Sequence, residues 1–533
     1  MHTTGTPYRK HAGIKGSFDA IVVGSGMGGM TASTLLAKQG LAVLLLEQNS
    51  VVGGLTQSYS RAGYKWNTGL HYIGDVAHEK TLTRRLFDYV TDANVKWAPL
   101  PEIYNRMAIG DRIYDIPAGR EPYTNALKTW FPEDAAAIDQ YMDLVMRASK
   151  ASAPYFGQKA FPMAMIGPQT EAMSEPFHEL SDRLTIDVLS ELTSNQELIA
   201  VLCANWGDYS SPPHRSSFAM HCMLNKHYLN GGSYPIGGAS VLADAMMPIV
   251  EAAGGKVHHS AEVEQILVEN GRAIGVRLVG GETVSAPIIV SNAGVQNTYS
   301  RLMAEPVARA SGLTDQIEAI NDTYALVGLN IGLNRPATEL GITPANIWAH
   351  PTRDFKANLD AHRTDFNVAF PWVFVTFPSV KDPSWDDAYP GKSTIEMYAY
   401  TTYEHFERWA GTRWMKRGED YNARKDIIRD RLLSELDKYV PNARSAIDVI
   451  EVSTPLSYET FVKRERGGFM GIESTPDRFR QTWLRSETPI NGLYLTGQDV
   501  TTDGVIGALM GGVICASAVL QKDILSEIRQ ATI

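Results

Sequence analysis

Cysteine is scarce in this chain. Its 533 residues include three cysteines, Cys203, Cys222 and Cys515, which lie far apart and form no C-x-x-C pair. Such spacing provides neither a disulfide framework nor a set of thiolate ligands for zinc. We therefore expect a chain that works in a reducing compartment and binds no metal ion.

An excess of positive charge and a long apolar run are also missing. The net charge is −10 and the isoelectric point is near 5.8, so we expect no nucleic-acid partner, because phosphate binding needs a basic face. The longest uncharged apolar stretch, Gly504 to Leu520, has 17 residues, whereas a membrane span needs about 20. We predict a buried helix there. The polar N-terminus lacks the apolar segment of a secretory signal.

The N-terminal region has the pattern of a strand, a glycine turn, a helix and a second strand. Strand-like runs at Ala20–Val23 and Ala42–Leu46 flank a G-x-G-x-x-G turn from Gly24 to Gly29. This spacing allows a tight turn, close approach of backbone to a pyrophosphate, and a helix N-terminus aimed at the phosphate. Glu47 ends the second strand, where it can accept a hydrogen bond from a ribose hydroxyl. The pattern predicts a Rossmann-type dinucleotide site in an α/β fold.

The residues that follow indicate which dinucleotide to expect. Gly53 and Gly54 come soon after Glu47, a pattern typical of flavoproteins rather than of nicotinamide dehydrogenases. FAD is therefore the expected cofactor. The sequence has one complete fingerprint, so we do not expect a second domain that holds NAD(P)H. Electrons are expected to pass to a quinone, dioxygen or another diffusible acceptor.

Two later blocks complete the same domain. Residues 231–300 combine a helical pattern with alternating runs typical of hairpin strands, and residues 486–533 combine a strand with a helix of small residues. We predict a Rossmann-type FAD-binding domain assembled from three chain segments, 1–100, 231–300 and 486–533. Two insertions interrupt it: a helical lid or substrate region at 101–230, and a mixed-sheet substrate-binding domain at 301–485. Strand-like runs in the second insertion are YALVGLNIGL, NVAFPWVFVTF and TIEMYAYTT.

Several short motifs occur together in this sequence. They are the glycine fingerprint, the Gly53–Gly54 pair, NTGLHYIG at 67–74, YPIGGASVLADAM, VSNAG and GLYLTGQDVTTDGVIGALMGG. In this combination the chain resembles the phytoene desaturase-like FAD-dependent oxidoreductases. Within that family it is most similar to the branch of retinol saturases, carotenoid cis–trans isomerases and related bacterial lipid desaturases. The motifs cover all three FAD segments, and they are specific for the family rather than for a substrate.

The resemblance implies a set of cofactor contacts. Glu47 would bind the adenosine ribose, Val263 would hold adenine through its backbone, and Asp499 would face the pyrophosphate or the ribityl chain. Asn67 stands where many relatives have aspartate. The residues expected to contact FAD are Gly24, Ser25, Gly26, Met27, Gly28, Gly29, Glu47, Gln48, Gly53, Gly54, Leu55, Thr56, Gly69, Leu70, His71, Tyr72, Val263, Asn292, Gly497, Asp499, Gly504, Val505, Ile506 and Gly507.

The loop NTGLHYIG contains the one candidate for catalysis, His71. Gly69 permits close approach of the backbone to a bound ring, and His71 and Tyr72 could then form the wall between flavin and substrate. His71 either exchanges a proton with the substrate or is a hydrogen-bonded loop residue, and the sequence leaves both open. Elsewhere, the spacings of the histidines between 214 and 227 do not form a metal-binding pair.

The resemblance predicts an oxidoreductase that acts on a carbon–carbon bond in a long apolar chain, either a carotenoid-like polyene or a fatty-acyl lipid. We favour desaturation. The first alternative is a saturase or a cis–trans isomerase that uses reduced FAD. The second is a non-catalytic flavoprotein that binds lipid, although an intact flavin-capping block at 497–512 argues against it.

Two features suggest contact with a membrane. The segment PYFGQKAFPMAMIGP at 154–168 is rich in aromatic residues and methionine, and we predict a lid that dips into a bilayer surface; cover for the core of the insertion is the alternative. Its prolines are expected to break any long helix. Basic clusters at 413–417 and 463–466 are predicted to be solvated surface, with contact to anionic headgroups as the alternative. The expected location is cytoplasmic, at the inner face of the cytoplasmic membrane.

Overall fold

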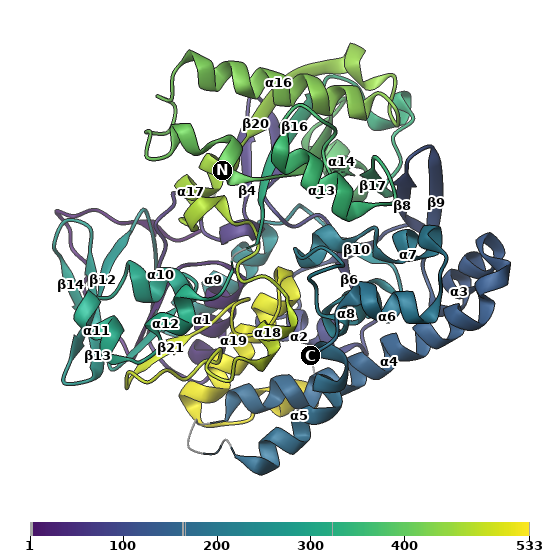
Figure 1. The fold of residues 1–533 in the computed structure, drawn as a ribbon. Coiled ribbons are helices and arrows are strands. Elements are labelled where there is room, and N and C mark those ends of the chain that lie inside the picture. The colour runs from purple at the N-terminus through teal and green to yellow at the C-terminus, as the bar shows by residue number, and fades with distance from the viewer. Residues whose placement is uncertain (1–3, 162–164, 166, 322, 532–533) are drawn as a thin grey trace.

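The computed structural model describes residues 4–161, 165, 167–321 and 323–531 (Figure 1). At its centre is a six-stranded sheet in which all neighbouring strands are parallel. The strand order is β1 (Thr6–Pro7), β11 (Lys256–His259), β3 (Val43–Leu46), β2 (Ala20–Val23), β15 (Ile288–Ser291) and β21 (Leu493–Leu495). These strands come from three distant parts of the chain, which confirms the predicted assembly of a Rossmann-type domain from three segments.

Both faces of this sheet are covered, as the continuous apolar runs of its strands require. Alternate residues such as Val22 and Leu45 pack on one face against five helices. These are α1 (Met27–Lys38), α2 (Leu82–Val90), α9 (Val241–Ala252), α19 (Gly504–Leu520) and α20 (Ile524–Gln530). Ile21 and Leu44 pack on the other face against a small antiparallel sheet. Its strands are β12 (Val263–Glu269), β13 (Arg272–Leu278) and β14 (Thr283–Ser285).

The helix α19 is the buried helix that the apolar run predicted. It packs closely on α1 because its glycines carry no side chain: a Cβ on Gly512 would come within 2.5 Å of Thr31 Cβ. Among the described residues, no single helix is long and apolar enough to cross a bilayer. The helices α19 and α20 reach that length and composition only as a pair, and this pair is bent by 115°.

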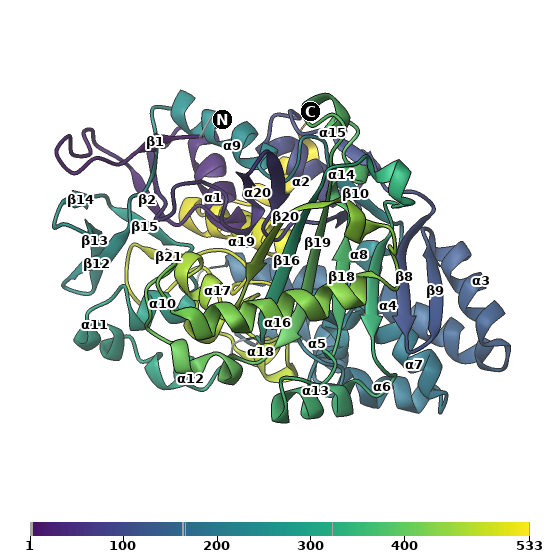
Figure 2. The same cartoon turned by 90° about the horizontal axis from the view of Figure 1, so that it is seen from above.

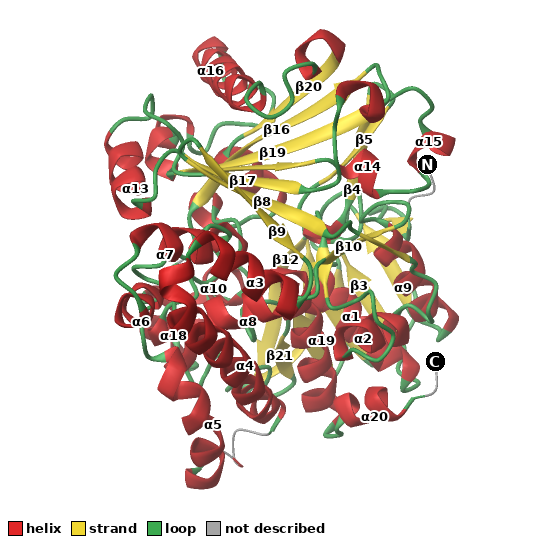
Figure 3. Ribbon diagram, turned by 90° about the vertical axis from the view of Figure 1, so that its right-hand side faces the viewer, coloured by secondary structure: helices red, strands yellow, loops and turns green. Residues whose placement is uncertain are grey.

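A second large sheet lies over the first domain (Figure 3). Its strand order is β20 (Ile447–Ser453), β16 (Ala325–Leu333), β19 (Ser393–Thr401), β18 (Val373–Thr376), β17 (Asn346–His350), β8 (Ile103–Ile109) and β9 (Arg112–Pro117). The three strand-like runs predicted in the second insertion are β16, β18 and β19. Neighbouring strands are antiparallel except β17 and β8.

The strands β8 and β9 differ from the prediction. The segment from residue 101 was assigned to a helical insertion, yet residues 103–117 form two strands of the large sheet. The reason is a long-range pairing: Asn105 on β8 lies opposite Asn346 on β17, 241 positions away. Such a pairing leaves no local trace in the sequence.

The two faces of the seven-stranded sheet have different chemistry. One face is apolar and lies under α16 (Glu419–Leu436), which crosses the strands in Figure 2. The opposite face carries a polar row that crosses five strands, Asn330, Glu396, Thr376, Asn346 and Asn105. Beside it runs an aromatic row, Tyr398, Phe374 and Trp348. This polar and aromatic face is turned toward the first domain and the helical region.

The helical region occupies the right side of Figure 1 and packs on the aromatic row. Its helices are α3 (Arg120–Trp130), α4 (Ala135–Gly157), α5 (Pro168–Ser181), α6 (Thr185–Leu192), α7 (Gln196–Cys203) and α8 (Phe218–Tyr228). The predicted break by proline is wrong for Pro154, which lies in the last turn of α4. There the missing N–H removes a single backbone hydrogen bond, and the helix tolerates it.

Smaller elements connect these parts. The short strands are β4 (Ser58–Arg61), β5 (Tyr64–Asn67), β6 (Ile73–Gly74), β7 (Trp97–Pro99) and β10 (Gly232–Pro235). The short helices are α10 (Val295–Ser300), α11 (Glu305–Ala310), α12 (Thr314–Glu318), α13 (Phe355–Thr364), α14 (Pro378–Lys381), α15 (Trp385–Ala388), α17 (Pro455–Phe461) and α18 (Pro476–Arg480). The strands β4 and β5 form a hairpin, and β10 lies between β6 and β7.

Candidate active site

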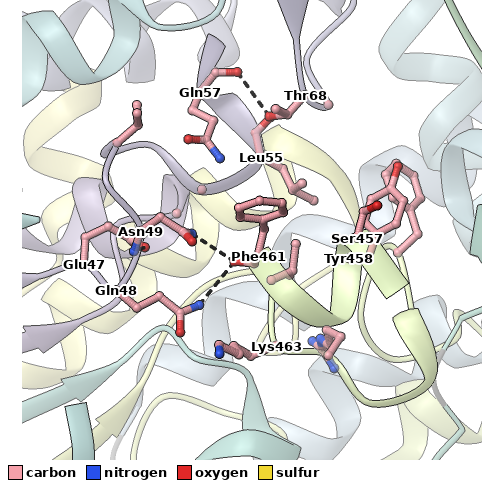
Figure 4. A pocket seen from close by; sticks show the side chains of 18 of the residues that line it. Glu47, Gln48, Asn49, Leu55, Gln57, Thr68, Ser457, Tyr458, Phe461 and Lys463 are labelled. Atoms are coloured by element: carbon pink, nitrogen blue, oxygen red, sulfur yellow. Dashed lines mark hydrogen bonds between the residues drawn. The ribbon is translucent and has the colours of Figure 1, made fainter. Parts of the chain in front are cut away.

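One large cavity lies where the carboxyl ends of the parallel strands meet the seven-stranded sheet. Its volume is about 1060 Å³, at the upper end of the ~300–1,000 Å³ of most ligand pockets. Open parallel sheets bind their ligands at this edge. Figure 4 shows that both domains supply the wall: Glu47 and Gln48 follow β3, whereas Tyr458 and Phe461 lie on α17.

The turn between β2 and α1 meets the cavity with backbone rather than with side chains. Gly24 has a φ of +94°, which glycine adopts without strain. Gly26 precedes α1 and caps it with no side chain, so the first-turn N–H groups stay available. A helix N-terminus of this kind attracts phosphate. Of the residues predicted here, Gly24, Ser25, Gly26, Met27 and Gly28 line the cavity.

Gly28 and Gly29 also set how closely α1 approaches its neighbours. A Cβ on Gly28 would overlap the backbone of Gly497, and a Cβ on Gly29 would overlap the carbonyl oxygen of Gly24. Neither Gly29 nor Gly497 lines the cavity. The structure therefore gives these two glycines a part in packing, and their predicted contact with the cofactor stays a prediction.

Glu47 is fixed at the end of β3 and is 4% exposed. Its Oε2 accepts hydrogen bonds from Ser25 N at 2.9 Å and Ser25 Oγ at 2.6 Å, and its Oε1 accepts one from Asn49 N at 2.8 Å. A carboxylate has about four acceptor positions, so Glu47 keeps capacity for a ribose hydroxyl. Val263 and Asn292 line the same part of the cavity.

The second helix that points into the cavity is α19. Gly504 and Val505 line the wall, whereas Ile506 and Gly507 do not. A Cβ on Gly507 would overlap the carbonyl oxygen of Thr502, so this glycine serves the tight turn into the helix. The uncharged first turn of α19 leaves a partial positive charge facing the cavity.

Two buried ion pairs fasten residues 464–478 to the loop before α19. Arg464 Nη2 donates to Asp499 Oδ1 and Arg478 Nη1 donates to Asp503 Oδ1, each at 2.7 Å. Burial raises the pKa of Asp503 to about 6, against the lowering effect of Arg478. Burial acts the same way on Asp499, but the positive charge of Arg464 and the hydrogen bond from Val295 N outweigh it and lower the pKa of Asp499.

Asp499 lines the cavity, and its predicted contact with the pyrophosphate or the ribityl chain stays a prediction. The prediction for its partner Arg464 was wrong. The cluster 463–466 was predicted to be solvated surface, yet the Arg464 side chain is 6% exposed. The reason is that its acidic partner lies 35 positions further along the chain, outside any local pattern.

The inner wall of the cavity comes from the seven-stranded sheet and α17. Tyr398 and Tyr458 are buried there. Tyr59 on β4 accepts a hydrogen bond through its hydroxyl from Asn330 Nδ2 at 2.7 Å. Sequence reasoning missed these wall residues. A signal was available on β19, where the polar and aromatic residues of IEMYAY alternate with apolar ones, as on a strand with two different faces.

The NTGLHYIG loop is split between the cavity and the interior. Gly69 lines the cavity. Leu70 is 1% exposed and packs in the core beside the parallel sheet. His71 lies behind Tyr398, with ring centroids 5.0 Å apart, and its Nδ1 is 2.9 Å from Glu396 Oε2. Tyr72 points away and donates its hydroxyl hydrogen to Asp208. His71 is therefore one layer behind the wall, and its catalytic role stays a prediction.

The remaining predicted contacts follow the same division. Gln48, Gly54, Leu55 and Thr56 line the cavity, whereas Gly53 does not. Gly53 has a φ of +125° and its N–H donates to Ser25 Oγ at 3.0 Å. It shapes the turn that brings the following residues to the wall.

Asn67, where aspartate was expected, has a clear structural part. Its Oδ1 accepts hydrogen bonds from Ala239 N at 3.0 Å and Ser58 Oγ at 2.9 Å. Its Nδ2 donates to Tyr234 Oη at 2.5 Å. An ionised carboxylate could accept the first two bonds, and the third contact would then require the Tyr234 hydroxyl to donate. The amide thus holds β5, β10 and the start of α9 together.

A buried lysine holds the loop from the side of the large sheet. Lys381 Nζ donates to the carbonyl oxygen of His71 at 3.2 Å and to Thr376 Oγ1 at 2.5 Å, and it also contacts Asn346. Burial lowers the pKa of Lys381 to about 7. Burial raises the pKa of Asp208 to about 7, against the lowering effects of Tyr72 and Lys381. Two ionisable groups, each with a pKa near 7, thus lie under the loop.

Two of the histidines between 214 and 227 have structural partners. Burial lowers the pKa of His221 to about 3, and its Nε2 is 3.0 Å from Tyr141 Oη. His227 Nε2 accepts a hydrogen bond from Gly74 N at 2.9 Å. Within the described ranges, no group of three or more His, Cys, Asp or Glu could hold a metal ion. The three cysteines are free and buried.

The predicted lid at 154–168 lies away from the cavity. None of its described residues lines the wall. Lys159 is buried, donates to the carbonyl oxygen of Leu484 at 2.6 Å, and has its pKa lowered to about 7 by burial. Phe161 and Met165 are exposed, and the predicted lipid-facing residues Met163 and Ile166 lie outside the described residues.

Comparisons with known proteins agree with this geometry. The family described as flavin containing amine oxidoreductase matches residues 27–520. An all-trans-retinol 13,14-reductase of Danio rerio is 34% identical over 527 residues, 95% of this chain and 86% of the relative. A chloroplastic prolycopene isomerase of Daucus carota is 24% identical, with 94% and 80% covered. The crystal structure of an oxidoreductase from Methanosarcina mazei has a TM-score of 0.64 at 17% identity, with 94% of this chain and all of that chain covered.

The donor set of the cavity fits FAD. Two helix N-termini, of α1 and α19, face one space, and a carboxylate at the end of β3 stands where a ribose hydroxyl would bind. The cofactor is FAD, as predicted. By its residues and its relatives, this chain belongs to the flavin-containing amine oxidoreductase family, in the branch of retinol saturases and carotenoid isomerases.

Proposed function

We propose that this protein saturates a carbon–carbon double bond in a retinoid-like or carotenoid-like polyene. The observation that carries the proposal is the continuity of one cavity, which joins the backbone cradle at Gly24–Gly28 to the aromatic wall at Tyr398 and Tyr458. A cofactor in the cradle and an apolar chain at the wall would share one space. Two relatives named all-trans-retinol 13,14-reductase support the reductive direction.

The inner wall suits a flat conjugated chain. Tyr398 and Tyr458 contribute aromatic rings to the wall, and Phe469 and Met470 also line the cavity. Aromatic rings and methionine pack well on extended π-systems. Because these side chains also exclude water, the reacting carbons would stay in a dry environment.

The protein's own residues bind, orient and hold charge. FAD, when bound, supplies the hydride. The N-terminus of α1 would hold the pyrophosphate and Glu47 the adenosine ribose, while Tyr398 would hold the polyene in line. His71 does not reach the cavity, so we assign it a positioning role: with Glu396 it supports the Tyr398 ring from behind.

Desaturation, which the sequence analysis favoured, is the same transfer in the opposite direction. The names of the relatives favour reduction, and reduction needs a diffusible electron donor in place of the predicted acceptor. Cis–trans isomerisation is the second candidate, favoured by the relatives named prolycopene isomerase. We also propose that the protein works at the inner face of the cytoplasmic membrane, because a polyene of this kind dissolves in lipid rather than in water.

A single-turnover experiment tests the direction of the reaction. Purified holoenzyme is reduced with dithionite under anaerobic conditions and mixed with all-trans-retinol or a carotenoid in detergent micelles. We expect the flavin absorption to return as the substrate gains two hydrogen atoms, read by mass spectrometry. Gly28→Val, which should lack the cofactor, is the negative control.

Each other outcome names a different function. A product that has lost two hydrogen atoms, with bleaching of oxidised flavin, would establish desaturation. A product of unchanged mass and altered double-bond geometry would establish isomerisation. Unchanged substrates throughout a panel of retinoids, carotenoids and fatty-acyl lipids would favour the non-catalytic alternative and overturn the proposal.

A further inference from the structure

The outer rim of the cavity carries an unusual set of exposed apolar side chains. Trp414, Met415 and Phe461 are 41%, 76% and 40% exposed, and all three line the cavity. The rings of Trp414 and Phe461 meet edge to face, with centroids 5.3 Å apart. A soluble protein seldom leaves tryptophan, methionine and phenylalanine together in water without a partner for them. We call these three residues the rim cluster.

The rim cluster is held in a fixed orientation. Trp414 and Met415 are the central residues of a tight turn closed by a hydrogen bond from Lys416 N to Arg413 O at 3.0 Å. Met415 has a φ of +61°, so the turn is a specific backbone conformation. Phe461 ends α17, and Figure 4 shows two side chains that hold its carbonyl oxygen: Asn49 Nδ2 donates to it at 2.9 Å and Gln48 Nε2 at 3.2 Å.

Exposed basic residues flank the rim cluster, although the chain as a whole has a net charge of −10 and the acidic Glu262 and Glu419 line the same cavity. Arg413 and Lys416 are the two corners of the turn and are exposed. Within the described part of the chain, neither has an acidic partner at ion-pair distance. Lys463 lies beside Phe461, is 34% exposed and pairs at 3.7 Å with Glu262, which is 42% exposed. The two basic clusters that the sequence placed 46 positions or more apart thus flank one opening.

We propose that the rim cluster and its basic flanks form the surface by which this protein docks on an anionic lipid bilayer. Trp, Phe and Met would enter the headgroup boundary, and the cations would contact lipid phosphates. The continuous cavity that joins the Gly24–Gly28 cradle to the wall at Tyr398 would then open at the bilayer surface. The inference rests on the proposed function, since an apolar substrate needs a path from lipid to the wall at Tyr398.

The same observations disfavour the predicted lid at 154–168 as the docking surface. Met165 is 64% exposed, but its segment does not reach the cavity, and the one lysine there, Lys159, is buried. A docking surface at that site would present no exposed lysine of its own segment to lipid phosphates and no entrance for substrate. Met165 therefore offers a matched control, a similarly exposed methionine on the competing surface.

Vesicle flotation of the holoenzyme tests the docking surface without any turnover. The vesicles are phosphatidylcholine alone or phosphatidylcholine with 30% phosphatidylglycerol, at low and high salt. We expect binding to the anionic vesicles that weakens at high salt. Met415→Asp should lower the partition coefficient at least about tenfold, whereas Met165→Asp should leave it unchanged. The double variant Arg413→Ala/Lys416→Ala should lower it roughly 30-fold at low salt.

Aspartate at 415 keeps the turn intact, because aspartate tolerates a left-handed backbone; flavin absorption and the melting temperature check this. Three results would overturn the proposal: wild-type protein that does not float, Met165→Asp that loses binding while Met415→Asp keeps it, or a rim cluster that proves to be a dimer contact which Met415→Asp dissociates. Flotation reads docking alone, so a failure of the polyene reductase proposal would show separately, in the single-turnover experiment.

Discussion

The two ends of the cavity are lined by different parts of the polypeptide. At the cofactor end, the wall is backbone: the turn from Gly24 to Gly28, the start of α19 at Gly504, and one fixed carboxylate at Glu47. At the substrate end, the wall is side chains of a sheet face, of which Tyr398 is an example. Backbone recognition allows almost no change, because a side chain would fill the space. A side-chain wall can change its substrate while the cofactor remains bound.

The largest expected effect comes from a substitution at the cofactor end. Gly28→Val would force a side chain into the backbone of Gly497, so α1 could not keep its place. We expect purified protein without flavin absorption and without activity. Gly157→Ala is the control, because a Cβ there meets nothing within 4 Å; it should keep a full complement of flavin. A yellow Gly28→Val protein would show that the close packing is not required.

The next effect concerns the connection between the two ends. Arg478→Met would leave Asp503 buried without its ion-pair partner and would free the carbonyl oxygens of Gln498 and Ile472. Breaking a buried pair in this way costs about 3–5 kcal/mol, to be read as a lower melting temperature and urea midpoint.

The control for this variant is Arg480→Met. Arg480 is 48% exposed and pairs with Asp182, which is 39% exposed, so its loss should cost less than about 1 kcal/mol. Equal effects of the two variants would contradict the importance of burial.

A third prediction uses the pH dependence of stability to test the ionisable group Asp208, which lies behind the substrate end of the cavity. The pKa of Asp208 is raised from its ordinary 3.8 to about 7, so between these values the folded state holds a proton that the unfolded state releases. The contribution of this group is therefore full below pH about 4 and is lost as the pH rises to about 7. Relative to wild type, Asp208→Asn should become more stable over that range by up to a few kcal/mol.

Urea unfolding at pH 5, 6, 7 and 8 measures this difference. Asp115→Asn is the control, since Asp115 is 52% exposed and should show no such trend. A difference between Asp208→Asn and wild type that does not change with pH would mean that Asp208 is ionised at all of these values.

A smaller effect is expected one layer behind the wall. Glu396→Gln removes the charge that faces His71 but keeps the shape of the side chain and the acceptor for Asn67 N. We expect full flavin content and a fall in kcat of about 10- to 100-fold, because misplacement of a wall residue by about 1 Å has consequences of this size. A pH profile that shifts in parallel would indicate a direct role of His71 in proton transfer rather than positioning.

The smallest effect should come from an exposed ion pair at the edge of the cavity. Arg61 pairs with Glu451 at 2.8 Å, and Arg61 is 51% exposed. Arg61→Ala should change the free energy of unfolding by less than about 1 kcal/mol. A larger loss of stability would show that this pair holds the β4–β5 hairpin against the edge strand β20.

The same division explains what could be predicted from the sequence. The cofactor end could be predicted because backbone recognition is encoded by short motifs. A single turn from Gly24 to Gly29 carries most of this recognition. The substrate end was not, because Asn330 and Glu396 become neighbours only through strand pairing. Arg464 was mistaken for surface for the same reason, since its partner lies in a different motif. The strands β8 and β9 were missed because their sheet partner lies far along the chain.

The three-segment construction of the parallel sheet also bears on how the protein is made. The strand β21 and the helix α19 come long after β2 in the chain, and both complete the cavity that begins at β2. At ~5–20 residues per second, synthesis from β2 to the end of α19 takes roughly 25–100 s. Throughout that time the nascent polypeptide lacks a finished cradle. Cofactor capture is thus expected late in biogenesis, once α19 has been synthesised and packed on α1.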